Sequence, residues 1–294
     1  MENRKLKTKK RLILFVIFAI GLGWLTFLMI PFLGVEYGQM SSTVFLIIAM
    51  FVPTISNILT RLITKEGFQN MYLRPNFKGN IKAYLLVFFG PTILLFLSAA
   101  FYFLIFPGNF DSELTMVKAS GIAGISPINV ILIMSLQVII LGPIINIIPT
   151  LGEELGWRGY LLPKLQEFFS DRKALVITGA IWGIWHLPAI VMGHNYGTNY
   201  IGYPVLGILA MIIFCIVLGI IEGYATIKLK SAVPAAMIHS TVNAGAGFPI
   251  VLAKGGYNTL LGPAITGLIG GLPFLIVAVI LFIKIGKREI KTEI

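Results

Sequence analysis

Residues 12–32 read LILFVIFAIGLGWLTFLMIPF, an apolar run without a single charged side chain. The hydrocarbon core of a bilayer is about 30 Å thick, and an α-helix crosses it in about 20 residues. The run is too long for the apolar part of a cleavable signal peptide, and it ends in Pro31 and Phe32 without a small-residue cleavage site. We therefore expect this stretch to form a membrane-spanning helix.

Seven further apolar runs follow, and together they predict an all-α, polytopic membrane helix bundle with about eight transmembrane helices. The expected spans are 12–32, 41–60, 83–106, 127–148, 175–191, 203–221, 232–252 and 262–283. The fifth span is the shortest, and glycines interrupt the seventh. No internal repeat, low-complexity tract or linker marks a second domain, so we expect residues 1–294 to form a single membrane domain.

The composition excludes several classes of protein. Of the 294 residues, 57% are apolar and 12% are charged, whereas a soluble domain has about 25% charged residues. A soluble enzyme, a secreted domain and a disordered chain are therefore excluded. The single cysteine, Cys215, excludes a disulfide framework and a cysteine-based zinc cluster. The net charge of +11 does not indicate nucleic-acid binding, because the basic residues are not gathered with aromatic residues on one element.

The basic residues instead indicate an orientation in the membrane. Of the 23 lysines and arginines, 21 lie in the N-terminal segment, in the second, fourth and sixth loops, and in the C-terminal tail. Lys118 and Lys254 are the exceptions. The positive-inside rule then predicts that both termini lie in the cytoplasm. We expect an integral protein of a bacterial cytoplasmic membrane. Its expected partner is the lipid bilayer, and we expect it not to bind nucleic acid.

In so apolar a chain, ionisable side chains at membrane depth are the candidates for function. The first group lies in residues 152–162, GEELGWRGYLL. Glu154 and Arg158 are four residues apart and can pair on one helix face, while Glu153 is turned about 100° away. An interfacial helix start, with two acids at its positive end, is the alternative interpretation.

Two later groups add histidines. Residues 182–188, WGIWHLP, contain Trp182 and His186, and residues 234–244, PAAMIHSTVNA, contain His239 and Asn243 on one helix face. A rise of about 1.5 Å per residue places His186 roughly 16 Å into its span. Each residue alone has a structural alternative: a hydrogen-bonded packing histidine, a core tryptophan, or an asparagine that joins two helices.

Taken together, the three groups favour a catalytic role over the structural alternatives. We expect Glu153, His186, His239 and Asn243 to meet in the cytoplasmic half of the bundle, where they suffice for acid–base chemistry on a water molecule. His194 lies in the 192–202 loop on the opposite face, so we expect it to take no part. Glu222 lies near the cytoplasmic end of the sixth span, where we expect an interfacial charge or, alternatively, a contribution to the rim of the cavity.

The three groups resemble, in order, the motifs of the CPBP intramembrane proteases, which include CAAX prenyl proteases and bacteriocin-processing or immunity proteins. These motifs are Glu-Glu-x-x-x-Arg, aromatic-x-x-x-His and His-x-x-x-Asn, and the resemblance covers a protease motif core at about 141–247. Trp182 departs from the pattern, since the family commonly has Phe there. We interpret this as a conservative change at a packing position.

The resemblance implies an intramembrane endopeptidase that acts on a membrane-associated, prenylated or bacteriocin-type substrate. Glu153 would be the general base that activates water, helped by His239, with His186 and Asn243 stabilising the oxyanion. Glu154 and Arg158 would form a supporting pair that orients the base. Glu153, His186 and His239 could also supply a three-ligand zinc site, although we expect no obligatory metal.

Two other classes of function stay open. Intramembrane glutamates and histidines also serve transporters and proton-coupled permeases as proton relays, although this chain shows no inverted repeat. A non-catalytic immunity or scaffold protein that retains the motifs is the second alternative. Zinc-peptidase, serine-nucleophile and aspartyl motifs (His-Glu-x-x-His, Gly-x-Ser-Gly and Gly-x-Gly-Asp) are absent from the sequence.

Overall fold

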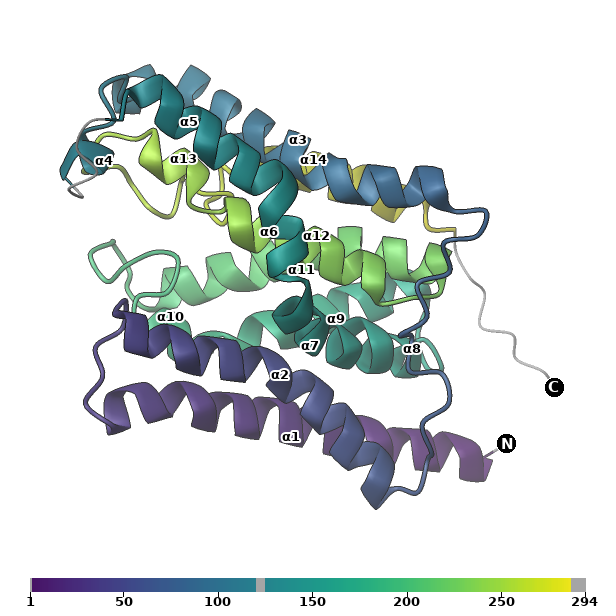
Figure 1. Cartoon of the computed structure of the whole chain (residues 1–294). Helices are drawn as coiled ribbons and strands as arrows, with labels where there is room; N and C mark the ends of the chain where they lie inside the picture. Colours follow the sequence, from purple (N-terminus) through teal and green to yellow (C-terminus); the bar gives the residue numbers. More distant parts are fainter. Residues whose placement is uncertain (1, 120–124, 287–294) are drawn as a thin grey trace.

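The structure is a computed structural model that describes residues 2–119 and 125–286, and these residues form an all-α bundle (Figure 1). The long helices are α1 (Glu2–Phe32), α2 (Met40–Ile63), α3 (Ile81–Ile105) and α11 (Val205–Leu229). The mid-length helices are α5 (Pro127–Leu136), α7 (Ile147–Gly156), α9 (Asp171–Trp185), α12 (Val233–Gly245) and α14 (Leu272–Lys284). Short segments connect them: η1 (Pro107–Asn109), α4 (Thr115–Ala119), η2 (Gln137–Leu141), α6 (Gly142–Ile145), η3 (Trp157–Leu161), α8 (Leu162–Leu165), α10 (Leu187–Val191) and α13 (Phe248–Val251).

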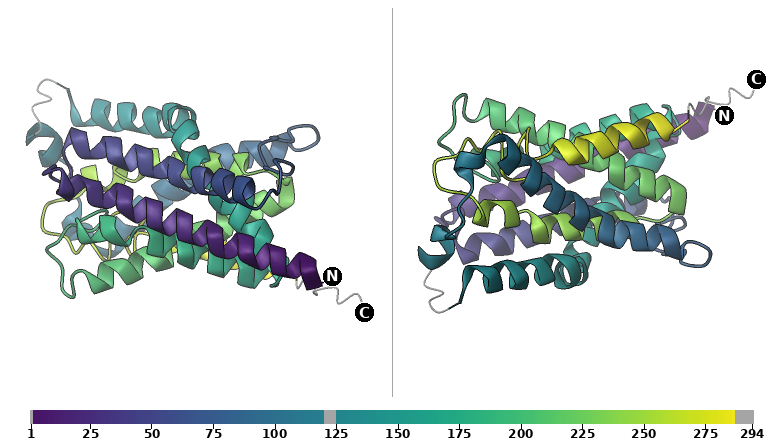
Figure 2. Two further views of the ribbon diagram at one scale, coloured as in Figure 1. Left: turned by 90° about the horizontal axis from the view of Figure 1, so that it is seen from below. Right: turned by 90° about the horizontal axis from the view of Figure 1, so that it is seen from above.

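The helices lie in layers. Helices α1 and α2 pack together on one side, α7, α9, α11 and α12 occupy the middle, and α3, α5 and α14 lie on the far side (Figure 1). Helix α11 packs against α9, α12 and α14, which makes it the central element. The beginning of α1 and the end of α14 lie at the same end of the bundle (Figure 2). We call this the basic end, because it also carries most of the lysines and arginines.

Five helices within the described ranges are long and apolar enough to cross a membrane, so the polytopic membrane class is supported and the expected count of eight is not confirmed. They are Asn3–Phe32, Met40–Ile63, Ile81–Ile105, Ile128–Ile145 and Val205–Leu229. Their outer surfaces expose large apolar side chains such as Ile17, Leu25 and Leu86. Apolar side chains outside and polar ones inside are the pattern of a protein whose solvent is lipid.

The three remaining expected spans are shorter helices, and their sequences explain the interruptions. In 175–191 the helix α9 stops before Pro188, which lacks an N–H and collides with the carbonyl one turn earlier. In 232–252 the helix α12 ends at Gly245, near Pro249. In 262–283 only the second half is helical, because glycines and Pro263 hold residues 262–271 in turns.

Glycines bring the site-bearing helices into backbone contact. A Cβ atom on Gly179 or Gly183 of α9 would lie 2.6 or 2.5 Å from a Cα atom of α11. A Cβ atom on Gly156 of α7 would lie 2.3 Å from the Cβ of Pro53 in α2. Small residues of this kind let membrane helices approach closely. They press α7 and α11 against their neighbours and so fix the position of the polar side chains between them.

Candidate active site

The polar residues of the three motifs come together in the centre of the bundle. Glu153, Trp182, His186, His239 and Asn243 line one cavity of about 370 Å³. Helix α7 supplies the carboxylate, the end of α9 supplies the indole and one imidazole, and α12 supplies the other imidazole and the amide. The ionisable members are buried, with exposed fractions of 3% for Glu153, 8% for His186 and 4% for His239. The structure thus brings together the residues that the sequence singled out.

Two tryptophans hold the carboxylate of Glu153. Its Oε2 accepts hydrogen bonds from the Nε1 of Trp182 at 2.8 Å and from the Nε1 of Trp157 at 3.3 Å. Both donors engage the same oxygen, which leaves Oε1 for other partners. The expectation that Trp182 is only a packing residue is therefore wrong: phenylalanine, the usual family residue, has no N–H to donate. The sequence analysis missed Trp157, although it lies four residues after Glu153, a spacing that places the two side chains on one helix face.

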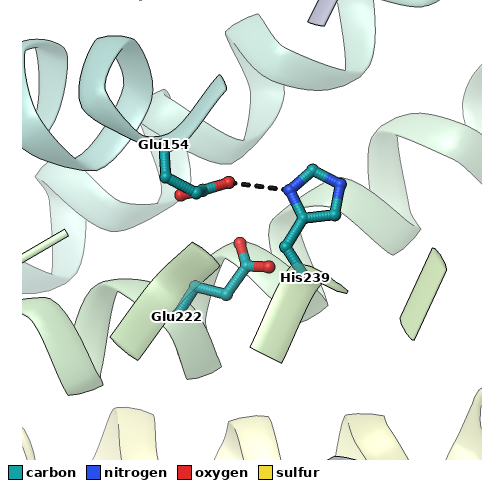
Figure 3. A group of neighbouring side chains, drawn as sticks. All are labelled: Glu154, Glu222 and His239. Carbon is teal, nitrogen blue, oxygen red and sulfur yellow. Dashed lines mark hydrogen bonds and ion pairs between the residues drawn. The ribbon is translucent and has the colours of Figure 1, made fainter. Parts of the chain in front are cut away.

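Glu154 orients His239 rather than the proposed base. Its Oε1 accepts a hydrogen bond from the Nδ1 of His239 at 3.0 Å (Figure 3). The same oxygen accepts a second hydrogen bond from the Nη1 of Arg158 at 2.9 Å. Because the Nδ1 proton is committed to Glu154, the Nε2 of His239 is the ring nitrogen that serves the cavity. The pairing of Glu154 with Arg158 agrees with the prediction. The pair was expected to orient Glu153, whereas the side chain that Glu154 contacts is His239.

Glu222 is a site residue that the sequence analysis misplaced. The expected interfacial charge is fully buried, and its Oε2 lies 2.5 Å from the Nη2 of Arg158. The guanidinium also stacks on Trp182, 4.2 Å from the ring centroid. Arg158 therefore joins two carboxylates and an indole, and it is not one of the surface charges that set the orientation. The reason is that α11 runs through the middle of the bundle, so a residue near its end is still surrounded by protein.

His186 and His194 form a pair that the sequence analysis excluded. Their rings are stacked, with centroids 6.1 Å apart and an angle of 7° between the planes, and His194 lines the same cavity. The loop after α10 turns back at Gly193, whose φ is +98°, and so returns the imidazole to the site. The Nδ1 of His194 contacts the hydroxyl of Tyr37. Burial lowers the pKa of His194 to about 4, so this loop histidine is neutral at neutral pH.

The tautomer of His186 is set by a backbone carbonyl. Its Nδ1 lies 2.9 Å from the carbonyl oxygen of Trp182, which can only accept. Nδ1 therefore carries the proton, and in the neutral ring the Nε2 presents a lone pair. It follows that His186 can donate to an oxyanion only when its ring carries both protons, whereas the side-chain amide of Asn243 is a donor at all times.

The cavity lies in the other half of the bundle from the one expected. The residues of α2 that line it lie between Thr43 and Met50, in the half of the helix remote from the basic end. The lining residues Met211 and Phe214 occupy the corresponding half of α11. The prediction of a site in the cytoplasmic half, as defined by the basic residues, is therefore not supported by the geometry.

A metal site needs several ligand atoms close to one another. The expected ligand trio Glu153, His186 and His239 does not form a group with mutually close donor atoms in the part of the chain that the structure describes. Glu154, Glu222 and His239 do, with one ligand atom from each within 4.8 Å of the others (Figure 3). These two carboxylates already contact the guanidinium of Arg158, which supplies the positive charge between them. A metal ion would have to displace that contact, so the residues as arranged do not fit one.

Comparison with known proteins agrees with the geometry. Residues 130–245 match the profile of the Rce1-like family, described as type II CAAX prenyl endopeptidases. Over 92 residues the chain is 33% identical to CAAX prenyl protease 2 of Methanococcus maripaludis, and the aligned segment is 31% of this chain and 34% of that relative. The match thus spans about a third of the relative's length. All three motifs lie inside the family match.

Proposed function

We propose that this chain, which belongs to the Rce1-like family of type II CAAX prenyl endopeptidases, hydrolyses a peptide bond inside the membrane with a water molecule activated by Glu153. The observation that carries the proposal is the clamped carboxylate: two indole N–H groups hold one oxygen of Glu153 in a cavity shared with both imidazoles and an amide. Such a fixed, largely dry arrangement is what general base catalysis requires.

The chemistry follows from the positions of the donors and acceptors. Glu153 takes a proton from water, and the water oxygen forms a bond to the carbonyl carbon of the substrate. Asn243 donates to the resulting oxyanion. His186, whose Nδ1 is held by the carbonyl oxygen of Trp182, faces the cavity with the lone pair of its Nε2 and can accept a hydrogen bond there. The C–N bond then breaks, and the proton held by Glu153 passes to the leaving nitrogen. His239, oriented by Glu154, is placed to relay that proton through its Nε2.

The substrate that this arrangement suits is a membrane-associated peptide or protein. The cavity lining is mainly apolar, from residues such as Phe27, Leu46 and Phe214. An apolar lining accepts a lipid-modified or hydrophobic segment and offers little to a hydrophilic solute. A prenylated protein and a bacteriocin precursor are both within this class. We place the protein in a cell membrane with its basic end in the cytoplasm.

The test is the replacement of Glu153 by Gln in protein reconstituted into proteoliposomes. This change keeps the size of the side chain and its acceptor oxygen but removes the base. With a library of fluorescence-quenched apolar peptides, we expect cleavage to fall by about 10²- to 10⁴-fold. Glu113→Gln is the matched control, because Glu113 is exposed and pairs only with exposed Lys118 in the described structure. Undiminished cleavage by Glu153→Gln would refute the mechanism.

The two alternatives predict different results in the same preparation. A transporter would show substrate-dependent flux that survives the Glu153→Gln change. A non-catalytic immunity or scaffold protein would keep its cellular phenotype when His186 or His239 is changed to Ala. An endopeptidase loses cleavage in all three variants.

A further inference from the structure

The position of the cavity along the helices indicates the side of the membrane from which it is reached. Thr43, Ile47 and Met50 line it from the half of α2 that follows the α1–α2 loop. Phe27 lines it from the last turns of α1, close to that same loop. Met211 lines it from the first turns of α11. Each of these positions is remote from the basic end.

The route from the basic end to Glu153 is closed by packed side chains. Trp157 and Arg158 are fully buried, and Tyr160, Leu161 and Leu162 are at most 1% exposed. These residues form η3 and the start of α8, directly after the helix that carries Glu153. The buried ion pairs of Arg158 with Glu154 and Glu222 lie in the same layer. This layer separates the reactive carboxylate from the basic end.

The opposite side of the cavity is open. Thr43 and Ile47 of α2 and Asn243 of α12 line the cavity and are exposed, Ile47 by 46%. Asn195, in the loop after α10, is likewise exposed and lines the cavity. The opening therefore lies between α2 and α12, beside the loops at the end remote from the basic residues.

The distribution of charge assigns these two ends to the two sides of the membrane. Within the described ranges, Lys118 and Lys254 are the basic side chains at the end toward which the cavity opens. The opposite end carries a much larger set: Arg4, Lys5, Lys7, Lys9, Lys10, Arg11, Arg61, Lys65, Arg74, Lys78, Lys82, Lys164, Arg172, Lys173, Lys228, Lys230 and Lys284. An asymmetry of this size places the basic end in the cytoplasm.

From these observations we infer that the substrate reaches Glu153 from the non-cytoplasmic half of the bilayer, through the opening between α2 and α12. The inference rests on the proposed peptidase function, and it specifies the substrate class. The substrate is an apolar peptide segment presented at the outer leaflet, such as a membrane-inserted or exported peptide, rather than a protein lipidated in the cytoplasm. Glu153 and the three histidines are the ionisable side chains of the described lining, and no lysine, arginine or second carboxylate faces the substrate there, so we infer that the segment around the scissile bond is uncharged.

Cysteine labelling in intact cells tests the sidedness without any substrate. Thr43→Cys places a thiol at the opening, and Lys78→Cys places a matched thiol in the exposed α2–α3 loop at the basic end. The native Cys215 is fully buried, so a membrane-impermeant maleimide reports the introduced residue. We expect Thr43→Cys to react in intact cells, and Lys78→Cys to react only after permeabilisation. The reverse pattern would overturn the inference.

Two reporter substrates then test the substrate class. Each is a transmembrane peptide with one uncharged test segment, placed in the outer or in the inner half of its span, and each is expressed with native protein or with Glu153→Gln. We expect native protein to cleave the outer-half reporter at least 10-fold faster than the inner-half reporter. Preferential cleavage of the inner-half reporter refutes the inference while the peptidase function stands. Cleavage of neither reporter, with the expected labelling, leaves the sidedness supported and counts against the peptidase function.

Discussion

The buried ion pair between Arg158 and Glu222 makes a quantitative prediction. Both side chains are fully buried, and the Nη2–Oε2 distance is 2.5 Å. Glu222→Leu removes one of the two carboxylates that neutralise the guanidinium and leaves Arg158 in apolar surroundings with Glu154 alone. Breaking a buried pair by removing one partner costs about 3–5 kcal/mol. We expect Glu222→Leu to unfold at a temperature several degrees below that of the native protein.

An exposed pair in the same chain is the control. Glu113 and Lys118 lie at a similar distance, 2.6 Å, but their side chains are 70% and 56% exposed. Exposed pairs contribute about 0–1 kcal/mol, because water and salt screen them. Glu113→Leu should therefore change the unfolding temperature little, and added salt should weaken the exposed pair and leave the buried pair almost unaffected.

Thermal unfolding of the purified variants in one detergent, at one pH and at two salt concentrations, measures both effects. Glu222→Gln separates charge from packing, because it keeps the volume of the side chain and removes the charge. If attraction to Arg158 is the cause, Glu222→Gln should lose most of the stability that Glu222→Leu loses. Equal unfolding temperatures for Glu222→Leu and Glu113→Leu would show that the buried pair does not stabilise the fold, and the reasoning would be refuted.

Three further predictions concern the site and its supports. Trp182→Phe removes the shorter of the two hydrogen bonds to the proposed base, so kcat should fall by about 10- to 100-fold. Trp157→Phe removes the longer one and should lower kcat by less, and equal kcat values for the two variants would contradict this. Gly156→Ala should destabilise the protein by about 1–3 kcal/mol, because the new Cβ would lie 2.5 Å from the α2 backbone. Gly90→Ala is the control: its new Cβ would have no contact below 3.7 Å, so it should stabilise the protein slightly in the same unfolding assay. Burial raises the pKa of Glu66, but hydrogen bonds from Lys164 and Tyr160 lower it by more, so the pKa in the folded protein lies below the ordinary value. The stability that results is complete above about pH 4.5 and is lost as the pH falls through the folded pKa. Glu66→Gln should therefore weaken the fall of the unfolding temperature with pH in this acidic range.

The candidate site shows which inferences sequence patterns support. Spacing of four residues placed Glu154 beside Arg158 and His239 on the same helix face as Asn243, because helical geometry alone decides such neighbours. The resemblance to a known family then pointed to Glu153. Trp182, in contrast, looked like packing, because its hydrogen bond to a carboxylate 29 residues earlier depends on how two helices cross.

The sequence by itself determined the membrane class, the all-α architecture and the asymmetry of charge, since these depend on the length of apolar runs and on composition, which are local properties. Only the tertiary structure decided which polar groups share an environment. It buried Glu222 against Arg158, returned His194 to the cavity and placed the cavity in the half remote from the basic end. These features depend on contacts between segments far apart in the chain. Their energies come from the exclusion of lipid and water from a common interior, which no single segment encodes.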